Sequence, residues 1–335
     1  MTEHTQRKHA RLSASRADRF VNCPGSVQLE NRMAYEASGP AAQWGTDVHE
    51  LSESIMRNEE VNAAKYEQEQ IDMAHAYIKY IDAIAESPRK KLIEVSVDEG
   101  LKSLHPALGG TADAVIVDGN TMHVVDLKTG RVFVNAEENL QLMTYALGAM
   151  RQFNAPASIE VVLHIFQPRA GSTTWHTTGA RLIEHGLQLK RAAELALSKD
   201  APTNPGASQC KYCRAKPICP SLREQATEAA RSDFKPDTVI TPEMLDTAYS
   251  VTAWAESIIE AAKRQMDTFP IEGWAMRAGR KTRFWSAQAM VEEAMRDNPA
   301  AWELKSPAAI AKLGIELADG MVGEKLSAPS LVKSK

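Results

Sequence analysis

Three charged side chains fall on two neighbouring predicted strands within the segment TADAVIVDGNTMHVVDLKTG, residues 111–130. Asp113 lies on the first strand, while Asp126 and Lys128 lie two residues apart on the second and therefore share a face. The Asp-Gly-Asn turn at 118–120 predicts a hairpin in which Asp126 pairs with residue 111 or 112. Asp113 is then a near neighbour across the ladder. Two carboxylates and an ammonium group would converge on one side of an otherwise apolar hairpin.

This arrangement of charges suits divalent-metal chemistry on a phosphate ester. Oxygens from two neighbouring carboxylates are a normal seat for Mg²⁺, which keeps several of its waters. A bound metal lowers the pKa of a water ligand and stabilises the charge that develops on a phosphate. A nearby lysine can orient the attacking water, help to deprotonate it and stabilise negative charge. An ion pair at the end of a strand gives the same pattern, so the pattern alone leaves both interpretations open.

Further polar residues lie before and after the hairpin at spacings that would bring them to the same place. The imidazole of His49 would add a nitrogen ligand to an oxygen-rich site, which favours Mn²⁺ over Mg²⁺. Gln141 and Tyr145 are four residues apart on a predicted helix, so they lie on one face and reach the same point. Glu94, on the strand predicted before the hairpin, is a further acidic contributor.

The elements that must position these residues alternate between helix and strand, which predicts an α/β layer fold. Helical spacing predicts helices at 41–57, 67–86 and 181–199. Asn135 and Glu138 resemble a capping box and predict the start of the helix that carries Gln141. Alternating or β-branched runs predict strands at 92–98 and 158–169 on either side of the hairpin.

In chain order, the stretches GTDVH, GGTADAVIV, HVVDLKTG and QLMTY resemble the motifs of the PD-(D/E)XK nuclease superfamily in its RecB-like branch. The resemblance implies a restriction-endonuclease-like core, in which helices flank a central mixed sheet. It implies Mg²⁺ or Mn²⁺ held by His49, Asp113 and Asp126. It also implies that Lys128 assists the attacking water, and that Gln141 and Tyr145 position DNA or the lysine.

Four cysteines, Cys23, Cys210, Cys213 and Cys219, account for every cysteine in the chain. The Cys-x2-Cys spacing is a common metal clamp, and four thiolates suit either zinc or an iron–sulfur cluster. A separate Cys23 beside a three-cysteine site is the other interpretation. One cysteine before the nuclease core and three after it resembles the AddB-type helicase–nuclease subunits and the CRISPR adaptation exonucleases. That resemblance implies a structural [4Fe–4S] cluster, with zinc as the alternative.

Basic residues that would contact DNA phosphates cluster in the run RAGRKTRFW near the C-terminus. They are Arg277, Arg280, Lys281 and Arg283. A solvated hairpin turn with core aromatics beside it is the alternative interpretation of this run. Arg169 ends a predicted core strand in the tripeptide QPR, and a resemblance to phage-encoded relatives implies a phosphate contact there.

The chain of 335 residues predicts two regions. Residues 1–232 would form the nuclease domain, stapled by the four cysteines. Residues 233–335 would form a mainly helical extension with a basic hairpin-like segment, resembling phage proteins described as a domain of unknown function. The chain has no apolar run of about 18 residues and a charged N-terminus, so neither a membrane span nor a secretory signal is expected. Cytoplasmic location, in the bacterial host if phage-encoded, is the expectation.

The expected function is a metal-dependent DNA exonuclease in phage or prophage recombination or DNA processing. DNA is the expected partner, with a phage single-strand annealing or recombination protein as a further candidate. A net charge of −4 requires any DNA-binding surface to be local. The alternatives are a non-catalytic DNA-binding recombination module on the same fold and a zinc-stapled structural protein. No P-loop is present, so no ATPase activity is expected.

Overall fold

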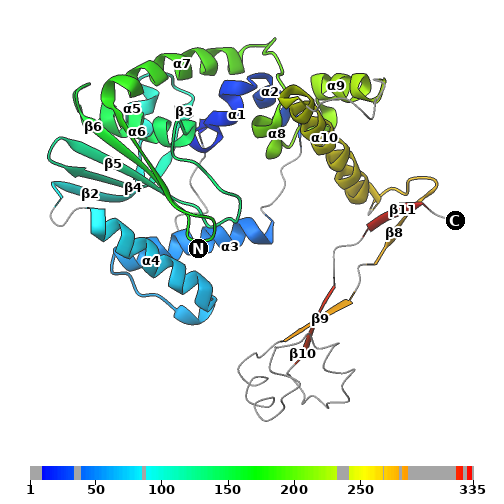
Figure 1. Cartoon of the computed structure of the whole chain (residues 1–335), viewed down its shortest axis with the longest axis horizontal. Helices are drawn as coiled ribbons and strands as arrows, with labels where there is room; N and C mark the ends of the chain where they lie inside the picture. Colours follow the sequence, from blue (N-terminus) through cyan, green and yellow to red (C-terminus); the bar gives the residue numbers. More distant parts are fainter. Residues whose placement is uncertain are drawn as a thin grey trace. The chain divides into compact units, whose positions relative to one another are not determined.

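The computed structural model describes residues 10–33, 39–84, 88–231, 241–266, 268–278, 281–285, 322–326 and 330–333. The chain divides into two compact units, Met1–Trp254 and Ala255–Lys335. Figure 1 shows the elements of both units. The boundary predicted at 232/233 lies outside the described residues.

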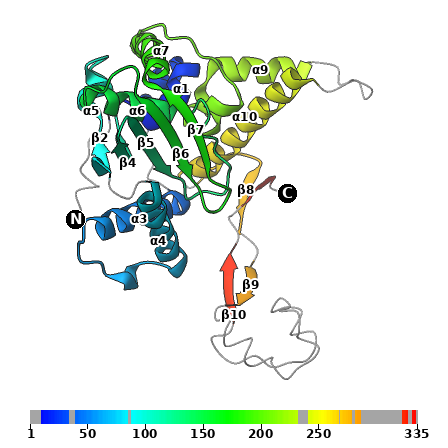
Figure 2. The ribbon, with the colours of Figure 1, turned by 60° about the vertical axis from the view of Figure 1, so that its left-hand side comes forward.

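A five-stranded sheet forms the centre of the first unit, with the strand order β2-β4-β5-β6-β7. Its strands are β2 (Lys90–Ser96), β4 (Thr111–Asp118), β5 (Thr121–Leu127), β6 (Glu160–Phe166) and β7 (Thr173–Thr178). The β5–β6 pair is parallel and the other three pairs are antiparallel. The predicted mixed α/β fold, with a mixed sheet flanked by helices, is therefore confirmed (Figure 2).

The β4–β5 hairpin is tighter than the sequence predicted. Its ladder closes at Asp118 and Thr121, so the turn consists of two residues, and Gly119 adopts a positive φ of 56°. The same register pairs Ala114 with Val125. The next positions along the ladder, Asp113 and Asp126, therefore face each other, whereas the prediction paired Asp126 with residue 111 or 112. Because the turn is shorter than predicted, the register of the two strands shifts and the two aspartates become direct neighbours.

Helices cover both faces of this sheet (Figures 1 and 2). On one face, α3 (Pro40–Met56) and α4 (Gln68–Ile84) build a core with Ala114, Ile116, Val125 and Leu127. On the other face, the larger core contains residues of α1 (Ala17–Asn22), α5 (Asp98–Lys102), α6 (Leu140–Gln152) and α7 (Gly179–Leu197). The helices predicted at 41–57, 67–86 and 181–199 are thus confirmed.

The start of α6 differs from the prediction. The side chain of Asn139 accepts a hydrogen bond from the backbone N–H of Leu142 at 3.1 Å and so caps the helix. Asn135 instead accepts from the backbone N–H of Glu137 at 3.2 Å in the preceding loop. Asparagine is a favoured N-cap residue at either position. The position of the loop before α6 decides that Asn139 is the one used.

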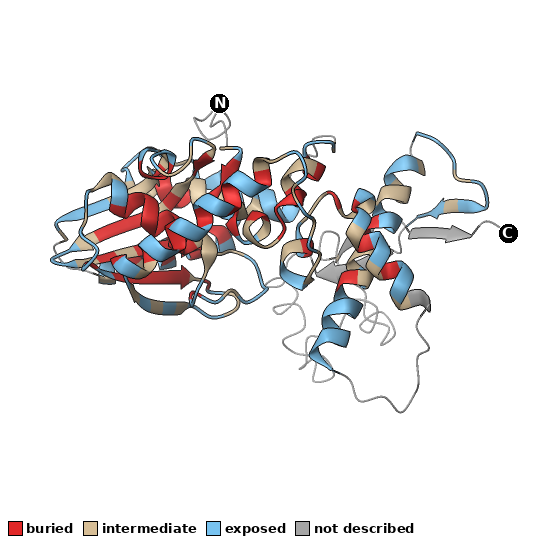
Figure 3. Cartoon of the chain, turned by 90° about the horizontal axis from the view of Figure 1, so that it is seen from above, coloured by how far each residue is buried: buried red, intermediate tan, exposed pale blue. Residues whose placement is uncertain are grey.

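Short elements complete the first unit. The two-residue strands β1 (Leu12–Ser13) and β3 (Leu108–Gly109) pair in parallel. The remaining helices are α2 (Gly25–Glu30), α8 (Ala207–Lys211), α9 (Pro220–Arg231) and the 3₁₀ turns at Ala14–Arg16, Ala63–Lys65 and Lys216–Ile218. Figure 3 shows buried residues concentrated in the sheet and its covering helices. Among the described residues, no helix is long and apolar enough to span a membrane.

Helix α10 (Pro242–Met266) runs from the first unit into the second. The second unit also contains β8 (Trp274–Arg277), β9 (Lys281–Trp285), β10 (Val322–Leu326) and β11 (Ser330–Lys333). Strand β8 pairs with β11, and β9 pairs with β10, both antiparallel. The basic segment is therefore not a hairpin in which β8 turns back onto β9, because each strand finds its partner near the C-terminus. The mainly helical character of 233–335 stays a prediction, since much of that range lies outside the described residues.

Candidate metal centre and cysteine group

Three potential metal ligands meet at the edge of the sheet where β5 ends. One ligand atom from each of His49, Glu94 and Asp113 lies within 4.8 Å of the others, and all three residues are half-buried. His49 Nδ1 of helix α3 is 3.5 Å from Asp113 Oδ2. That carboxylate oxygen also accepts the backbone N–H of Leu127 at 2.7 Å, which fixes its direction. Two carboxylates and an imidazole in partial contact with solvent suit Mn²⁺ or Mg²⁺.

Glu94 reaches this group through an unusual backbone conformation. The β2–β4 ladder pairs Ile93 with Ala114 and Val95 with Ala112, but does not include a pair for Glu94. Glu94 has a φ of 47°, which is rare for a residue other than glycine inside a strand. Such a conformation costs about 1–3 kcal/mol and is retained where the surroundings require it. Here it interrupts the strand opposite Asp113 and places the carboxylate beside that residue.

A second network lies next to the metal ligands, on the side of the sheet that α6 covers. Asp126 Oδ2 is 2.8 Å from Lys128 Nζ, and the lysine also donates to Gln141 Oε1 at 3.0 Å. Gln141 Nε2 lies within hydrogen-bonding distance of Asp126 Oδ1, at 2.9 Å, and of the Tyr145 hydroxyl, at 3.1 Å. The structure thus brings together all four of these predicted site residues. Asp126 is bound to the lysine and does not belong to the three-residue group that contains Glu94.

The pKa values of the two aspartates are shifted in opposite directions. Burial raises the pKa of Asp126, and the Asp113 charge raises it further against the opposing effect of Lys128. Burial also acts to raise the pKa of Asp113, but His49 overrides this and lowers it. For His49, burial opposes protonation, yet the Asp113 charge raises its pKa to about 9. Burial raises the pKa of Tyr145, the hydrogen-bond partner of Gln141, far above its usual range. The negatively charged Asp113 therefore stabilises the protonated, positively charged form of His49.

Close backbone approaches position the helices around the site. A Cβ atom on Gly45 would lie 2.7 Å from Thr129 Oγ1, so a larger residue there would displace the Thr129 hydroxyl or α3. A Cβ atom on Gly110 would lie 2.9 Å from the ring of Tyr145. At positions 45 and 110, a larger residue would therefore clash with a neighbouring side chain.

Arg169 reinforces the same junction. Its Nε donates to Glu69 Oε1 at 2.8 Å and its Nη1 to the carbonyl of Thr129 at 3.1 Å. Its guanidinium carbon lies 4.0 Å from the ring centroid of Trp44, one residue before Gly45. The arginine thus ties α3 and α4 to the loop after Lys128. A phosphate contact by Arg169 stays a prediction.

The other predicted DNA contacts lie in the second unit. Arg277 is exposed on β8, and its backbone pairs with Ser330. Lys281 and Arg283 lie on β9, where they pair with Leu326 and Glu324. Arg280 lies outside the described residues. Their contact with DNA stays a prediction.

The four cysteines gather where α1, α2 and α8 meet, with no disulfide among them. One short segment of backbone, 204–206, reaches both Cys23 and Cys210, so the distant cysteine lies beside the cysteine segment. Backbone N–H groups point at the sulfurs, as Asn204 does at Cys23 Sγ (3.2 Å). Burial raises the pKa of Cys213 to about 11.

A buried carboxylate holds the cysteine segment to the N-terminal helices. Glu30 is 4% exposed and pairs with Arg16 at 2.6 Å and Arg19 at 2.9 Å. The same carboxylate accepts the backbone N–H of Arg214 at 2.9 Å. Arg19 also donates to the carbonyl of Tyr212 at 2.5 Å. This network connects both ends of the domain independently of the sulfurs.

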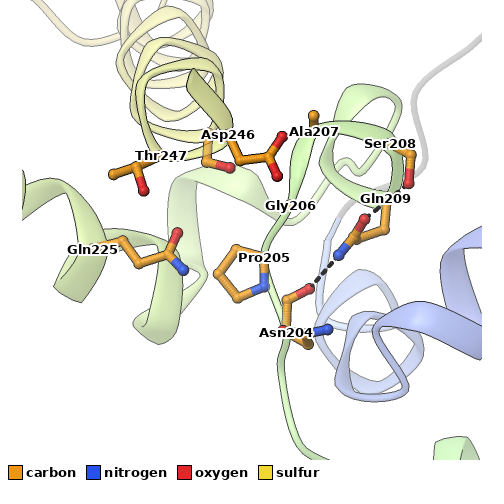
Figure 4. A pocket seen from close by; sticks show the side chains of 10 residues that line it. Asn204, Pro205, Gly206, Ala207, Ser208, Gln209, Gln225, Asp246 and Thr247 are labelled. Carbon is orange, nitrogen blue, oxygen red and sulfur yellow. Dashed lines mark hydrogen bonds between the residues drawn. The ribbon is translucent and has the colours of Figure 1, made fainter. Parts of the chain in front are cut away.

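A polar pocket of about 420 Å³ is lined by the segment before Cys210 and by helices α9 and α10 (Figure 4). The segment from Asn204 to Gln209, a loop that runs into the first residues of α8, forms one wall, and Gln225, Asp246, Thr247 and Ser250 form the rest. Gln209 Nε2 donates to the carbonyl of Asn204 at 2.9 Å. The backbone N–H of Gly206 in the same loop donates to Cys210 Sγ at 3.4 Å. The wall of the pocket and the cysteine group therefore share one loop.

Fold and site together define a mixed α/β protein with an acidic and histidine-containing group at the sheet edge and a separate four-cysteine group. The chain belongs to the family described as "Protein of unknown function (DUF2800)", whose model matches residues 9–332. A solved structure described as "Crystal structure of SSO0001" is similar at 17% identity and a TM-score of 0.33. That similarity covers 65% of this chain and 91% of the other.

Sequence reasoning treated Glu94 as secondary and did not single out Glu30. An acidic residue in the middle of an apolar strand was the available signal for Glu94. For Glu30 the signal is weaker, because acidic residues at the end of a short helix are common. Its burial depends on Arg16, Arg19 and a segment about 180 residues away, as the ion pairs and the Arg214 hydrogen bond show.

Proposed function

We propose that this protein is a metal-dependent DNA exonuclease of the RecB-like PD-(D/E)XK type. The observation that carries the proposal is the meeting of His49, Glu94 and Asp113 within 4.8 Å at the end of the hairpin that also holds Asp126 and Lys128. An isolated ion pair at a strand end would not require a third carboxylate in a strained conformation. The same set of groups suits hydrolysis of a phosphodiester.

His49, Glu94 and Asp113 would hold Mg²⁺ or Mn²⁺, with Asp126 as a further candidate ligand on the adjacent strand. The metal, when bound, supplies a water of lowered pKa and stabilises charge on the phosphate. Lys128 is held between Asp126 and Gln141. Its ammonium would stabilise negative charge on the scissile phosphate. Gln141 orients both partners of the ion pair, and the Tyr145 hydroxyl in turn orients the amide.

We extend the proposal to a structural [4Fe–4S] cluster at the four cysteines. Four thiolates suit either zinc or an iron–sulfur cluster. The layout, with one cysteine before the core and three after it, resembles that of iron–sulfur exonucleases and supports the cluster over zinc. Because the cysteines come from both ends of the domain, binding energy at this centre becomes folding energy.

The setting of the reaction follows from the resemblance. Phage or prophage recombination in the bacterial cytoplasm is the proposed context, with DNA as substrate and a single-strand annealing or recombination protein as partner. The cysteine group supports this by its likeness in layout to exonucleases that process DNA ends.

The test uses anaerobically purified protein and end-labelled single- and double-stranded DNA, with and without Mn²⁺. We expect cleavage that needs Mn²⁺ and is lost in Asp126→Ala, while the iron content and the broad visible absorbance stay unchanged in that variant. Asp118→Ala, at the solvent end of the same hairpin, is the matched control and should cleave normally. Metal-independent binding without cleavage would instead identify a DNA-binding module, and zinc without iron would identify a zinc-stapled protein.

A further inference from the structure

The loop after Lys128 is held in a fixed shape by a buried side chain. Gln167 is 1% exposed, and its Nε2 donates to the carbonyls of Gly130 (2.9 Å) and Val132 (2.8 Å). Its Oε1 accepts the backbone N–H of Val134 at 3.0 Å. Both N–H donors and the oxygen of a buried amide thus bind the backbone of one surface loop, whose far end is also anchored in the core by Val134 and Ala136.

This fixed loop presents apolar side chains to solvent. Val132 is 55% exposed and Phe133 is 56% exposed, and the neighbouring Arg131 is also exposed. Burying such side chains would stabilise the fold by about 1.5–3 kcal/mol each, so the loop gives up stability by holding them outward. An ordered loop with an outward aromatic and a cation beside the catalytic lysine indicates a contact surface.

A second exposed aromatic comes from the cysteine segment. Tyr212, between Cys210 and Cys213, is 72% exposed, and its backbone is anchored by the Arg19 hydrogen bond described above. The ammonium of Lys211 lies 5.3 Å from its ring centroid. Contacts join this segment to the Lys128 site: a Cβ on Gly110 would lie 2.9 Å from the Tyr145 ring and 3.0 Å from Ala14 Cβ. Ala14 begins the 3₁₀ turn whose Arg16 pairs with Glu30 in the network that holds the cysteine segment. Each of the two aromatics therefore has a cation within two residues of it in the sequence.

We propose that Phe133 and Tyr212 stack on the bases of a single-stranded DNA end as its phosphate enters the site. Arg131 and Lys211 would contact the neighbouring phosphates. Aromatic side chains bind single strands in this way because every unpaired base offers a π-face, whereas bases inside a duplex are already stacked. The inference rests on the proposed function, since it assumes that the substrate is DNA at the Lys128 site.

The test measures binding of two labelled oligonucleotides, oligo-dT and an abasic strand of equal length, in the cleavage-deficient Asp126→Ala protein. We expect Phe133→Ala and Tyr212→Ala each to weaken oligo-dT binding about tenfold or more and to leave the abasic strand nearly unchanged. Phe133→Trp should retain binding. Tyr249→Ala is the matched control, because Tyr249 is 66% exposed on α10. Thermal unfolding and iron content establish that each variant is folded.

Oligo-dT binding equal to that of the control variant in both alanine variants would overturn the inference, as would equal losses for both oligonucleotides. Failure of the proposed function has a different signature. If the wild-type protein binds oligo-dT through these aromatics but cleaves no DNA with Mn²⁺, the base contacts stand and the exonuclease assignment falls. If it cleaves DNA but the alanine variants bind normally, only the base contacts fall.

Discussion

The glycine at position 45 gives a direct test of how the site is positioned. In Gly45→Ala the new Cβ would stand 2.7 Å from Thr129 Oγ1, whereas ordinary contact begins at 3.4 Å. The Thr129 hydroxyl, with the loop that carries it, must therefore shift by about 0.7 Å relative to α3. A misplacement of about 1 Å can cost ~10²-fold in rate, so we expect Mn²⁺-dependent cleavage to fall by about 10- to 100-fold.

The stability of Gly45→Ala should not fall together with its activity. Alanine is favoured over glycine inside a helix by about 1 kcal/mol, which offsets the cost of the displacement. Thermal unfolding of Gly45→Ala should therefore occur near or above the wild-type temperature while cleavage is impaired. This opposite response separates a positioning defect from unfolding.

A second substitution completes the test. Thr129→Ala removes Oγ1 and leaves the Thr129 Cβ, 3.8 Å from the new methyl group, as the nearest atom. The double variant should therefore recover most of the activity, and Thr129→Ala alone should cleave normally. Cleavage is measured on end-labelled DNA across Mn²⁺ concentrations. Wild-type activity in Gly45→Ala, or no recovery in the double variant, would refute the proposed role of this contact.

Three further outcomes follow from the buried charges. Glu30→Ala leaves Arg16 and Arg19 unpaired, so we expect a loss of about 3–5 kcal/mol in unfolding free energy and a lower iron content; denaturant titration beside the exposed control Glu224→Ala measures it. His185 has its pKa lowered to about 4, first by burial and then by Arg181. The folded state therefore resists protonation, and stability present above about pH 6.5 should decline toward pH 4 by up to about 3 kcal/mol. Replacing His185 with glutamine should flatten that decline, and an unchanged slope in pH-dependent unfolding would contradict it. Finally, Mn²⁺ must displace the proton that Asp113 holds on His49, whose pKa is about 9. Apparent Mn²⁺ affinity measured by calorimetry should thus rise from pH 6 to 9, and a flat profile would exclude His49 as a ligand.

Much of the scaffold was readable from local patterns. The helices that carry His49 and Gln141 and the strands of the hairpin follow from hydrophobic periodicity and turn chemistry, which depend on neighbouring residues. The same patterns placed Asp126 and Lys128 on one face. The start of α6 was predicted at the wrong asparagine, because Asn135 and Asn139 are equivalent as sequence signals and the loop decides between them.

The sequence alone determined which side chains are available for chemistry and the face of the element on which each one lies. Tertiary structure decided which of them meet. The strained Glu94 joins His49 and Asp113 because β2 must bend opposite the hairpin, and no local signal encodes that bend. Likewise, Cys23 reaches Cys210 only because helices far apart in the sequence pack together. Local preferences act over a few residues, whereas contacts across the fold depend on how whole elements pack.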